Sequence, residues 1–549
     1  MKKNLTLLIA LLISLSVTAQ EKLNERPVLV VGIVVDQMRH EYLYRYADKF
    51  GKGGFKRLMG QGFMLTNAHY NYAPTFTGPG HASVYTGTTP AIHGIIANDF
   101  YDKHTGKMVN CVGDSRYLAV GGESNNGYVS PSRMLSTTIT DELRLFSQKK
   151  SKVVGISFKD RGASLPAGHV ANGAYWFDER SGGFMTSTFY MSKLPEWLMV
   201  FNKLGLPDQY LSQEWNTFFP IEQYTESGPD SSPYESRLIG KEKSVFPYNL
   251  KELRKKNGGY DLLSGTPFAQ DLLTELAKAT IDGENLGKDD WTDFLTISYS
   301  TTDIIGHAMG PNAVEVEDTY IRLDRNIEDL MKKLDKDIGE ENYIIFLTAD
   351  HAVAEVPQYL RDNKVPAGYS NPNNLQVNLK EFLQKYFPGK EVVDNISNNQ
   401  IFLNHEVFNG NPKTSGIDLM IATELIKNFL MTVDGIADVY TESAIRMAAY
   451  DEGGIRGMVA RGYNAKRSGD ITYILEPGWI EWGKVQGSTH GSTYAYDTHV
   501  PVLFYGFGIK KGTSAHYHPI TDIAPTLSVL LKIRFPSGCT GQPIEELLK

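Results

Sequence analysis

Three aspartates and three histidines combine the residue types and the spacing expected of ligands to a pair of metal ions. Asp303 and His307 are four residues apart, so one turn of helix would aim both side chains at one ion. Asp350 and His351 are adjacent, so they would converge on one ion only where the chain turns. The other two candidates are Asp36 and His490. Carboxylate and imidazole ligands suit zinc, and three ligands for each of two ions would leave positions open for water and substrate.

Each of the six has an ordinary structural explanation when it is taken alone. A single histidine is more often a hydrogen-bonded structural side chain, and an aspartate after a strand is more often a helix cap. Six such residues together make that explanation weak. We assign no ligand role to the histidines that lack a comparable setting, which are His40, His81, His93, His104, His169, His405, His499, His516 and His518.

A threonine in a glycine-rich loop is the candidate nucleophile. Thr77 begins the run Thr-Gly-Pro-Gly-His, in which Pro79 suits the first turn of a helix and the glycines allow close approach of a ligand. Thr77 is therefore expected near a helix N-terminus, where backbone amides favour an oxyanion. Helix capping alone would also explain a threonine here, but metal ligands nearby would make its hydroxyl a nucleophile. Thr75 and Thr86 are competitors.

Four apolar, β-branched runs supply the elements that must position these residues. They span residues 28–35, 152–158, 294–299 and 343–347. Runs of this kind are typical of strands buried on both faces of a parallel sheet. Amphipathic segments lie between them, at residues 136–147, 269–279 and 316–334. Strands that alternate with helices predict an α/β fold, a doubly wound, mostly parallel sheet with helices on both faces.

Each of the four runs ends on polar residues, and this predicts where the site lies. In open α/β sheets, ligands bind outside the carboxyl ends of the strands. Asp36 ends the first run, Lys159-Asp160-Arg161 follows the second, and Asp303 and Asp350 follow the other two. One such cluster could be a turn, whereas four from well-separated parts of the chain predict one site.

Two segments are expected to be additions to this sheet. Residues 197–262 are rich in proline, tyrosine, serine and charge, and we expect surface excursions there. Residues 375–478 are expected to form a small inserted α+β cap with helices at 379–386 and 418–432 and a strand at 470–475. The catalytic domain would then cover residues 20–549.

The threonine loop at Thr77 and the ligand motifs together resemble the alkaline phosphatase superfamily, because they occur in that family's order. The resemblance extends over nearly all of the chain beyond residue 19. The resemblance implies the same α/β sheet. It implies one zinc ion held by Asp303, His307 and His490. It implies a second zinc ion held by Asp36, Asp350 and His351, with Thr77 placed toward both.

Three further residues bear on the substrate. Lys159 and Arg161, as alternate residues at a strand end, could face the same way, and Asn98 adds an amide donor. This set looks like the phosphate-irrepressible (PafA-type) monoesterases, whereas the diesterase branch normally lacks the Lys and Arg pair. A monoester carries more negative charge than a diester and gains more from cationic donors. The alternative is that Lys-Asp-Arg is a solvated charged turn. Sulfatases are excluded, because Thr77-Gly-Pro-Gly-His does not match their Cys/Ser-x-Pro-x-Arg motif.

The N-terminus predicts export. Lys2 and Lys3 precede an apolar run over residues 5–15, and Val17-Thr18-Ala19 fits a signal peptidase site, so residues 1–19 are expected to be a signal peptide. A retained anchor is the alternative. The protein would be periplasmic or secreted, without a membrane span once the signal is removed. The net charge of −8 argues against a nucleic acid duplex as partner. Cys111 and Cys539 could form a disulfide or remain thiols.

The sequence therefore predicts an exported two-zinc alkaline phosphatase, favoured as a monomer. It would hydrolyse small phosphate monoesters through a phospho-threonine intermediate. A phosphodiesterase or nucleotide pyrophosphatase is the alternative. A non-catalytic phosphate-binding protein is a weaker one, because no ligand or nucleophile is missing from the sequence.

Overall fold

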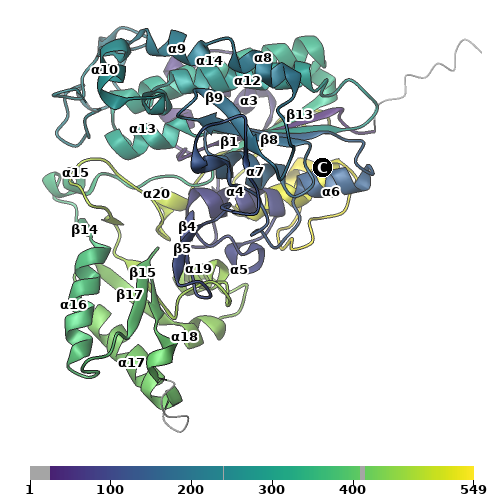
Figure 1. The fold of residues 1–549 in the computed structure, drawn as a ribbon. Helices are drawn as coiled ribbons and strands as arrows, with labels where there is room; N and C mark the ends of the chain where they lie inside the picture. The colour runs from purple at the N-terminus through teal and green to yellow at the C-terminus, as the bar shows by residue number, and fades with distance from the viewer. Residues whose placement is uncertain (1–24, 239, 409–414, 549) are drawn as a thin grey trace, which may run out of the picture.

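The computed structural model of the protein describes residues 25–238, 240–408 and 415–548 (Figure 1). The expected signal peptide and its cleavage site lie outside these residues. Within the described part of the chain, no helix is long and apolar enough to cross a membrane.

Five parallel strands form the centre of a ten-stranded sheet. In spatial order they are β13 (Tyr343–Thr348), β1 (Leu29–Val35), β12 (Asp293–Tyr299), β7 (Val153–Ser157) and β8 (Gly173–Asp178). Every residue of β1 is buried, as its unbroken apolar run requires of a strand covered on both faces. The first four of these strands coincide with the four predicted runs, so the predicted parallel core is confirmed.

Antiparallel strands extend the sheet at both edges, so the whole sheet is mixed. On one side β20 (Val502–Gly506) runs antiparallel to β13, followed by β2 (Phe63–Leu65) and β21 (Gly512–Ser514). On the other side β9 (Gly183–Ser187) runs antiparallel to β8 and is followed by β6 (Ala119–Val120). The sequence reasoning did not anticipate these edge strands, because most of them are too short to give a periodic signal.

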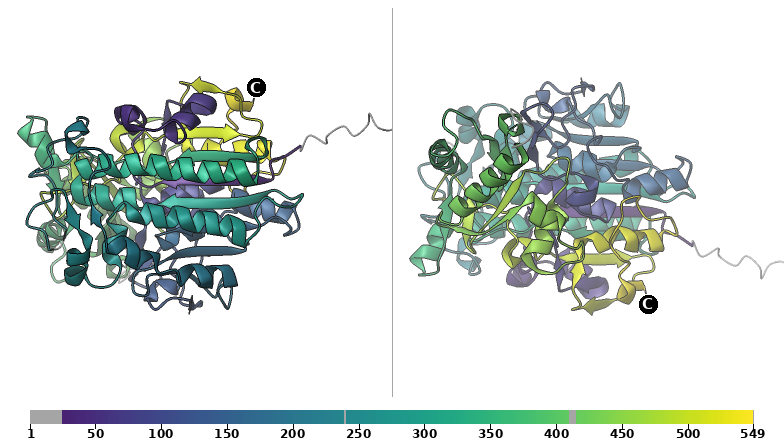
Figure 2. Two further views of the ribbon diagram at one scale, coloured as in Figure 1. Left: turned by 90° about the horizontal axis from the view of Figure 1, so that it is seen from above. Right: turned by 90° about the horizontal axis from the view of Figure 1, so that it is seen from below.

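Helices cover both faces of the sheet, as predicted. Figure 1 shows α12 (Phe268–Gly283) and α14 (Val314–Asp337) above it, and Figure 2 shows these two long helices side by side. The opposite face is covered by α4 (Thr77–Thr86), α6 (Ile139–Phe146) and α7 (Asp160–Ala167). Residues 197–238 and 240–262 form short helices and a two-stranded ribbon. The ribbon packs on the α14 side through Trp215, whose Nε1 donates to Asp318 at 2.7 Å.

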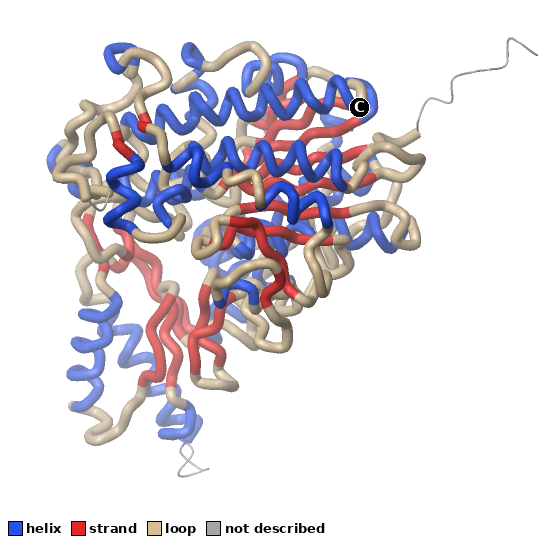
Figure 3. The backbone as a smooth tube through the Cα atoms, turned by 45° about the horizontal axis from the view of Figure 1, so that its top comes forward, coloured by secondary structure: helices blue, strands red, loops and turns tan. Residues whose placement is uncertain are grey.

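A second, four-stranded sheet has its own hydrophobic core. Its order is β15 (Val393–Ser397), β16 (Gln400–Leu403), β18 (Ile471–Leu475) and β17 (Ile436–Thr441). Two helices pack on it, α16 (Pro372–Gln384) and α17 (Ser415–Leu430), and the unit projects from the main body (Figure 3). We call this unit, with its four strands and two helices, the small lobe. The small lobe lies where the cap was expected, although α16 begins three residues before residue 375. The assignment of residues 375–478 as a cap inserted in the catalytic domain stays a prediction.

Candidate active site

Thr77 is the first residue of α4, and all ten residues of this helix are buried. Its hydroxyl oxygen lies 3.5 Å from His351 Nε2. The glycines serve close contacts: a Cβ on Gly80 would lie 2.3 Å from the carbonyl oxygen of Asp350. The hydroxyls of the two competing threonines are engaged elsewhere, because Thr75 donates to the Ser492 carbonyl and Thr86 to the Ala82 carbonyl.

The first ligand group consists of Asp36, Asp350 and His351, whose ligand atoms all lie within 4.8 Å of one another. All three side chains are fully buried. His351 Nε2 lies 3.4 Å from Asp36 Oδ1 and 3.7 Å from Asp350 Oδ2. Neither of those carboxylate oxygens has a hydrogen-bond partner. Buried, unpartnered carboxylate oxygens are costly unless a cation pairs with them, so this geometry fits a bound metal ion.

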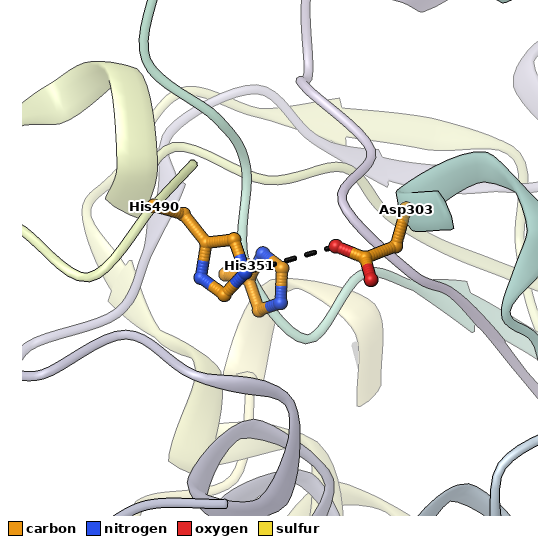
Figure 4. Close-up of side chains that lie close together, drawn as sticks. All are labelled: Asp303, His351 and His490. Carbon is orange, nitrogen blue, oxygen red and sulfur yellow. Dashed lines mark ion pairs between the residues drawn. The ribbon is translucent and has the colours of Figure 1, made fainter. Parts of the chain in front are cut away.

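A second group lies beside the first and contains Asp303, His351 and His490, again within 4.8 Å of one another. Figure 4 shows the Asp303 carboxylate directed toward the stacked imidazoles of His351 and His490, whose ring centroids are 3.4 Å apart. His307 lies on the same carboxylate, with its Nε2 3.0 Å from Asp303 Oδ1. Both come from α13 (Thr301–Met309), so the expected one-turn spacing is present. His351 thus belongs to both groups.

The three candidate ligand histidines are held in the same way. Their Nδ1 atoms lie 2.7–2.9 Å from backbone carbonyl oxygens, which can only accept a hydrogen bond. Nδ1 must therefore carry the proton, and Nε2 presents its lone pair to the site. The histidines and their carbonyl partners are His307 with Ser488, His351 with Ala352, and His490 with Thr75.

The electrostatics of the site also suit divalent cations. Burial, together with the carboxylates of Asp303 and Asp350, holds the pKa of Asp36 well above its ordinary value. Burial acts in the same direction on Asp303, but His307 and Lys159 outweigh it and hold the pKa of Asp303 well below its ordinary value. Such crowded carboxylates need positive charge among them, which two metal ions would supply.

Lys159 and Arg161 lie at the site but not as predicted. The helix α7 begins at Asp160, so Lys159 is its N-cap residue and Arg161 lies in its first turn, and they are not alternate residues of a strand. Lys159 Nζ lies 2.7 Å from Asp36 Oδ2 and 2.5 Å from Asp303 Oδ2, and so bridges the two ligand groups. Burial lowers the pKa of Lys159, but these two carboxylates outweigh it and raise that pKa. The solvated-turn alternative is therefore wrong for Lys159.

The other two clamp candidates keep free donors. Arg161 has a buried Nε without a hydrogen-bond partner. Asn98 accepts a hydrogen bond from the backbone N–H of Gly78 at 2.6 Å, which places its amide at the N-terminus of α4. Its side-chain NH₂ remains able to donate to a ligand there.

Two residues that support the ligands were missed by the sequence reasoning. Gln37 donates from Nε2 to Asp303 Oδ1 at 2.6 Å and from its backbone N–H to Asp350 Oδ1 at 3.2 Å. His81, left without a role above, has Nδ1 2.8 Å from the Thr77 carbonyl and 3.3 Å from Asp350 Oδ2. The position of His81, four residues after Thr77, was the available signal, because that spacing places both on one helix face.

The chain is similar in sequence and in fold to several known proteins. A family model described as type I phosphodiesterase / nucleotide pyrophosphatase matches residues 30–494. Alkaline phosphatase PafA of Elizabethkingia meningoseptica is 43% identical over 95% of both chains. Alkaline phosphatase PhoV of Synechococcus elongatus is 44% identical over 95% of this chain and 93% of its own. A Myroides odoratus protein described as a calcium-transporting ATPase is 44% identical over 98% and 97%. The crystal structure of wild-type PafA gives a TM-score of 0.91 at 42% identity, covering 95% of this chain and 99% of that one.

Proposed function

The chain belongs to the type I phosphodiesterase / nucleotide pyrophosphatase family of the alkaline phosphatase superfamily, and we propose that it is an exported two-zinc alkaline phosphatase. Its similarity to PafA and PhoV over most of the chain makes it a phosphoric monoester hydrolase.

The observation that carries the proposal is the position of Lys159 between the two ligand groups. Its ammonium is within 2.7 Å of a carboxylate from each group, so positive charge is fixed where a phosphoryl group would bind. A monoester places one more negative charge there than a diester. In one solved structure of a PafA variant, a Thr, an Asn, a Lys and an Arg are substituted together. The same four residue types follow one another in this chain as Thr77, Asn98, Lys159 and Arg161, which supports the proposal that they act in one site.

The chain's own residues would divide the work as follows. Asp303, His307 and His490 would hold one zinc ion, and Asp36, Asp350 and His351 the other. Bound zinc ions would supply Lewis-acid stabilisation of charge on the attacking and departing oxygens.

Thr77, at the N-terminus of α4, would attack phosphorus and lose its hydroxyl proton, while the P–O bond to the alcohol breaks and the alcohol leaves. Water would then hydrolyse the phospho-threonine, which releases inorganic phosphate and restores the hydroxyl of Thr77. Asn98, Lys159 and Arg161 would hold the phosphoryl oxygens through both steps. Gln37 would keep the aspartate ligands oriented through its hydrogen bonds, as groups around a metal centre commonly do, and His81 would support Asp350 through its 3.3 Å contact with Oδ2.

A phosphodiesterase remains the second candidate, because the matching family model is named for that activity. The test compares turnover of an aryl phosphate with that of its methyl diester in the presence of zinc. Dominant monoester turnover is expected, and dominant diester turnover would overturn the proposal. ATP belongs in the same panel, because the Myroides relative is described as an ATPase. Fewer than two bound ions per chain, without chelator-sensitive activity, would favour a non-catalytic binding protein.

Export has its own test. Mass spectrometry of protein from the periplasm or medium should find a mature N-terminus at Gln20, after removal of residues 1–19. A chain recovered only with Met1 and in the membrane fraction would instead indicate a retained anchor.

A further inference from the structure

A cavity of about 200 Å³ lies between the small lobe and the loops next to the candidate nucleophile. One wall comes from the small lobe and the strand that follows it, and includes Gln400, Tyr473, Trp479 and Glu481. Phe76, His490 and Thr493 belong to the opposite wall, on the main body. The volume is sufficient for an aromatic ring with a substituent.

The cavity shares a wall with the metal centre. His490 lines the cavity, and its Nε2 is also 3.7 Å from Asp303 Oδ1. The ring of Phe76 meets the ring of His490 edge-on at 5.7 Å, and Phe76 directly precedes Thr77. In an in-line displacement the alcohol departs on the side of phosphorus opposite the Thr77 hydroxyl. The cavity borders the second ligand group at His490, so it is an enclosed space next to the site that can take the rest of the alcohol.

Most of the cavity's surface is apolar, and its two acidic side chains are Glu481, which is partly exposed, and Asp497, which is buried. Tyr473 is fully buried and donates from its hydroxyl to Glu481 Oε2 at 3.3 Å. The side chain of Glu481 is only partly buried, so its other carboxylate oxygen can accept from a ligand. Asp497 also lines the cavity; its Oδ2 accepts from the backbone N–H groups of Gly491 and Ser492, and its Oδ1 is buried without a hydrogen-bond partner. The lining residues within the described ranges include no lysine or arginine. The cavity is therefore largely apolar. Burial raises the pKa of Glu481 and raises that of Asp497 to about 7, so the cavity is net negative when these carboxyl groups ionise at alkaline pH.

We propose that this cavity binds the alcohol part of the phosphate ester, and that Glu481 makes it favour uncharged or cationic leaving groups over anionic ones. The substrate class would be monoesters of aromatic or similarly sized alcohols that carry hydroxyl or amine groups. Esters whose alcohol bears a second phosphate or a carboxylate would be poor substrates, because they would bring an unpaired anion next to Glu481 in a partly desolvated space. This inference rests on the proposed phosphatase function.

The test uses benzyl phosphates with para aminomethyl, hydroxymethyl or carboxyl substituents, assayed with the zinc-loaded enzyme at alkaline pH. The three leaving groups have similar size but different charge. We expect kcat/KM for the aminomethyl ester to exceed that for the carboxyl ester by roughly tenfold or more, and Glu481→Gln to bring this ratio close to one. Glu476→Gln is the matched control, because it removes the same charge from an exposed position after β18 and should leave the ratio unchanged.

A binding measurement supplies a second readout. Titration with 4-(aminomethyl)benzyl alcohol should change the tryptophan fluorescence of the protein, and Trp479→Phe should remove most of that change. A charge-independent wild-type ratio, a ratio insensitive to Glu481→Gln, or a fluorescence change that survives Trp479→Phe would each overturn the cavity assignment. Methyl phosphate separates the two hypotheses, because its leaving group cannot reach the cavity. If methyl phosphate is hydrolysed and the ratio of kcat/KM for the aminomethyl and carboxyl esters does not depend on charge, only the cavity assignment is refuted. If none of the esters is hydrolysed, the proposed phosphatase function is refuted, and this inference with it.

Discussion

Replacing Lys159 with alanine should weaken the preference for monoesters while both metal ions remain bound. The ammonium lies 2.7 Å from Asp36 and 2.5 Å from Asp303, so it is fixed at the junction of the two ligand groups. Its removal leaves those carboxylates with less positive charge nearby, and cations should bind to them at least as well as before. The loss should therefore appear in transition-state stabilisation and not in metal content.

The magnitude follows from charge and distance. A unit of charge at about 4 Å from the ammonium corresponds to about 4 kcal/mol at an effective dielectric constant of ~20. Metal ions and Arg161 would also interact with that charge. We therefore assign about half of this energy, roughly 2 kcal/mol, to the interaction of Lys159 with the additional charge of a monoester. This corresponds to a fall of roughly 30-fold in the ratio of monoester to diester kcat/KM.

The assay measures kcat/KM for an aryl phosphate and its methyl diester with wild type, Lys159→Ala and Lys159→Arg, and metal content by mass spectrometry. Lys159→Arg keeps the charge but not the shape, so it should recover part of the ratio. Lys150→Ala removes a charge from an exposed position at the other end of β7 and should change nothing. Equal losses for both esters with both ions retained would refute the charge argument, and loss of an ion would show that Lys159 organises the ligands instead.

Three further predictions concern the nucleophile, the metal ions and a buried carboxylate. Thr77→Ala should lower kcat/KM for an aryl phosphate by about a thousandfold or more, and should abolish the phosphopeptide found after acid quenching, which Thr77→Ser should retain. Chelation should abolish activity and zinc should restore it, with two ions per chain by elemental analysis and at most one in Asp36→Asn. Burial and the neighbouring Glu315 raise the pKa of Glu235 to about 10. Because the unfolded chain releases that proton near pH 4.5, stability contributed by Glu235 falls as pH rises between these values. In urea titrations, the free energy of unfolding of Glu235→Gln should therefore increase relative to that of wild type as pH rises. Glu242→Gln, which changes an exposed residue, should show no such increase.

The sequence predicted the parts of the fold that depend on local pattern. The buried run of β1 and the helix α14 have strong apolar periodicity, and their positions were predicted to within about three residues. The antiparallel strand β20 was missed, because its place in the sheet depends on pairing with β13, a contact more than 150 residues away in the chain. Such non-local pairing leaves no periodic signal of its own.

The site was predictable in its members but not in all its contacts. Strand ends predicted that Asp36, Asp303 and Asp350 would meet. The strand pattern suggested that Lys159 continues β7, whereas the chain turns there into α7. Gln37 adopts a positive φ of 66°, unusual for a residue with a side chain, and only this conformation with the surrounding fold brings it to Asp303. Neither feature is visible in residue types or spacing.

The order of the strands explains why Asp36 lies where the two ligand groups meet. The strand β1 pairs with β12 on one side and with β13 on the other, so Val35 lies opposite Tyr299 and Val34 opposite Thr348. Asp36 therefore follows directly between the segments that carry Asp303 and Asp350. A two-residue slip of β1 would move Asp36 by about 7 Å, which is beyond the reach of Lys159 and His351. The position of this carboxylate thus depends on the register of a buried apolar strand that has no chemistry of its own.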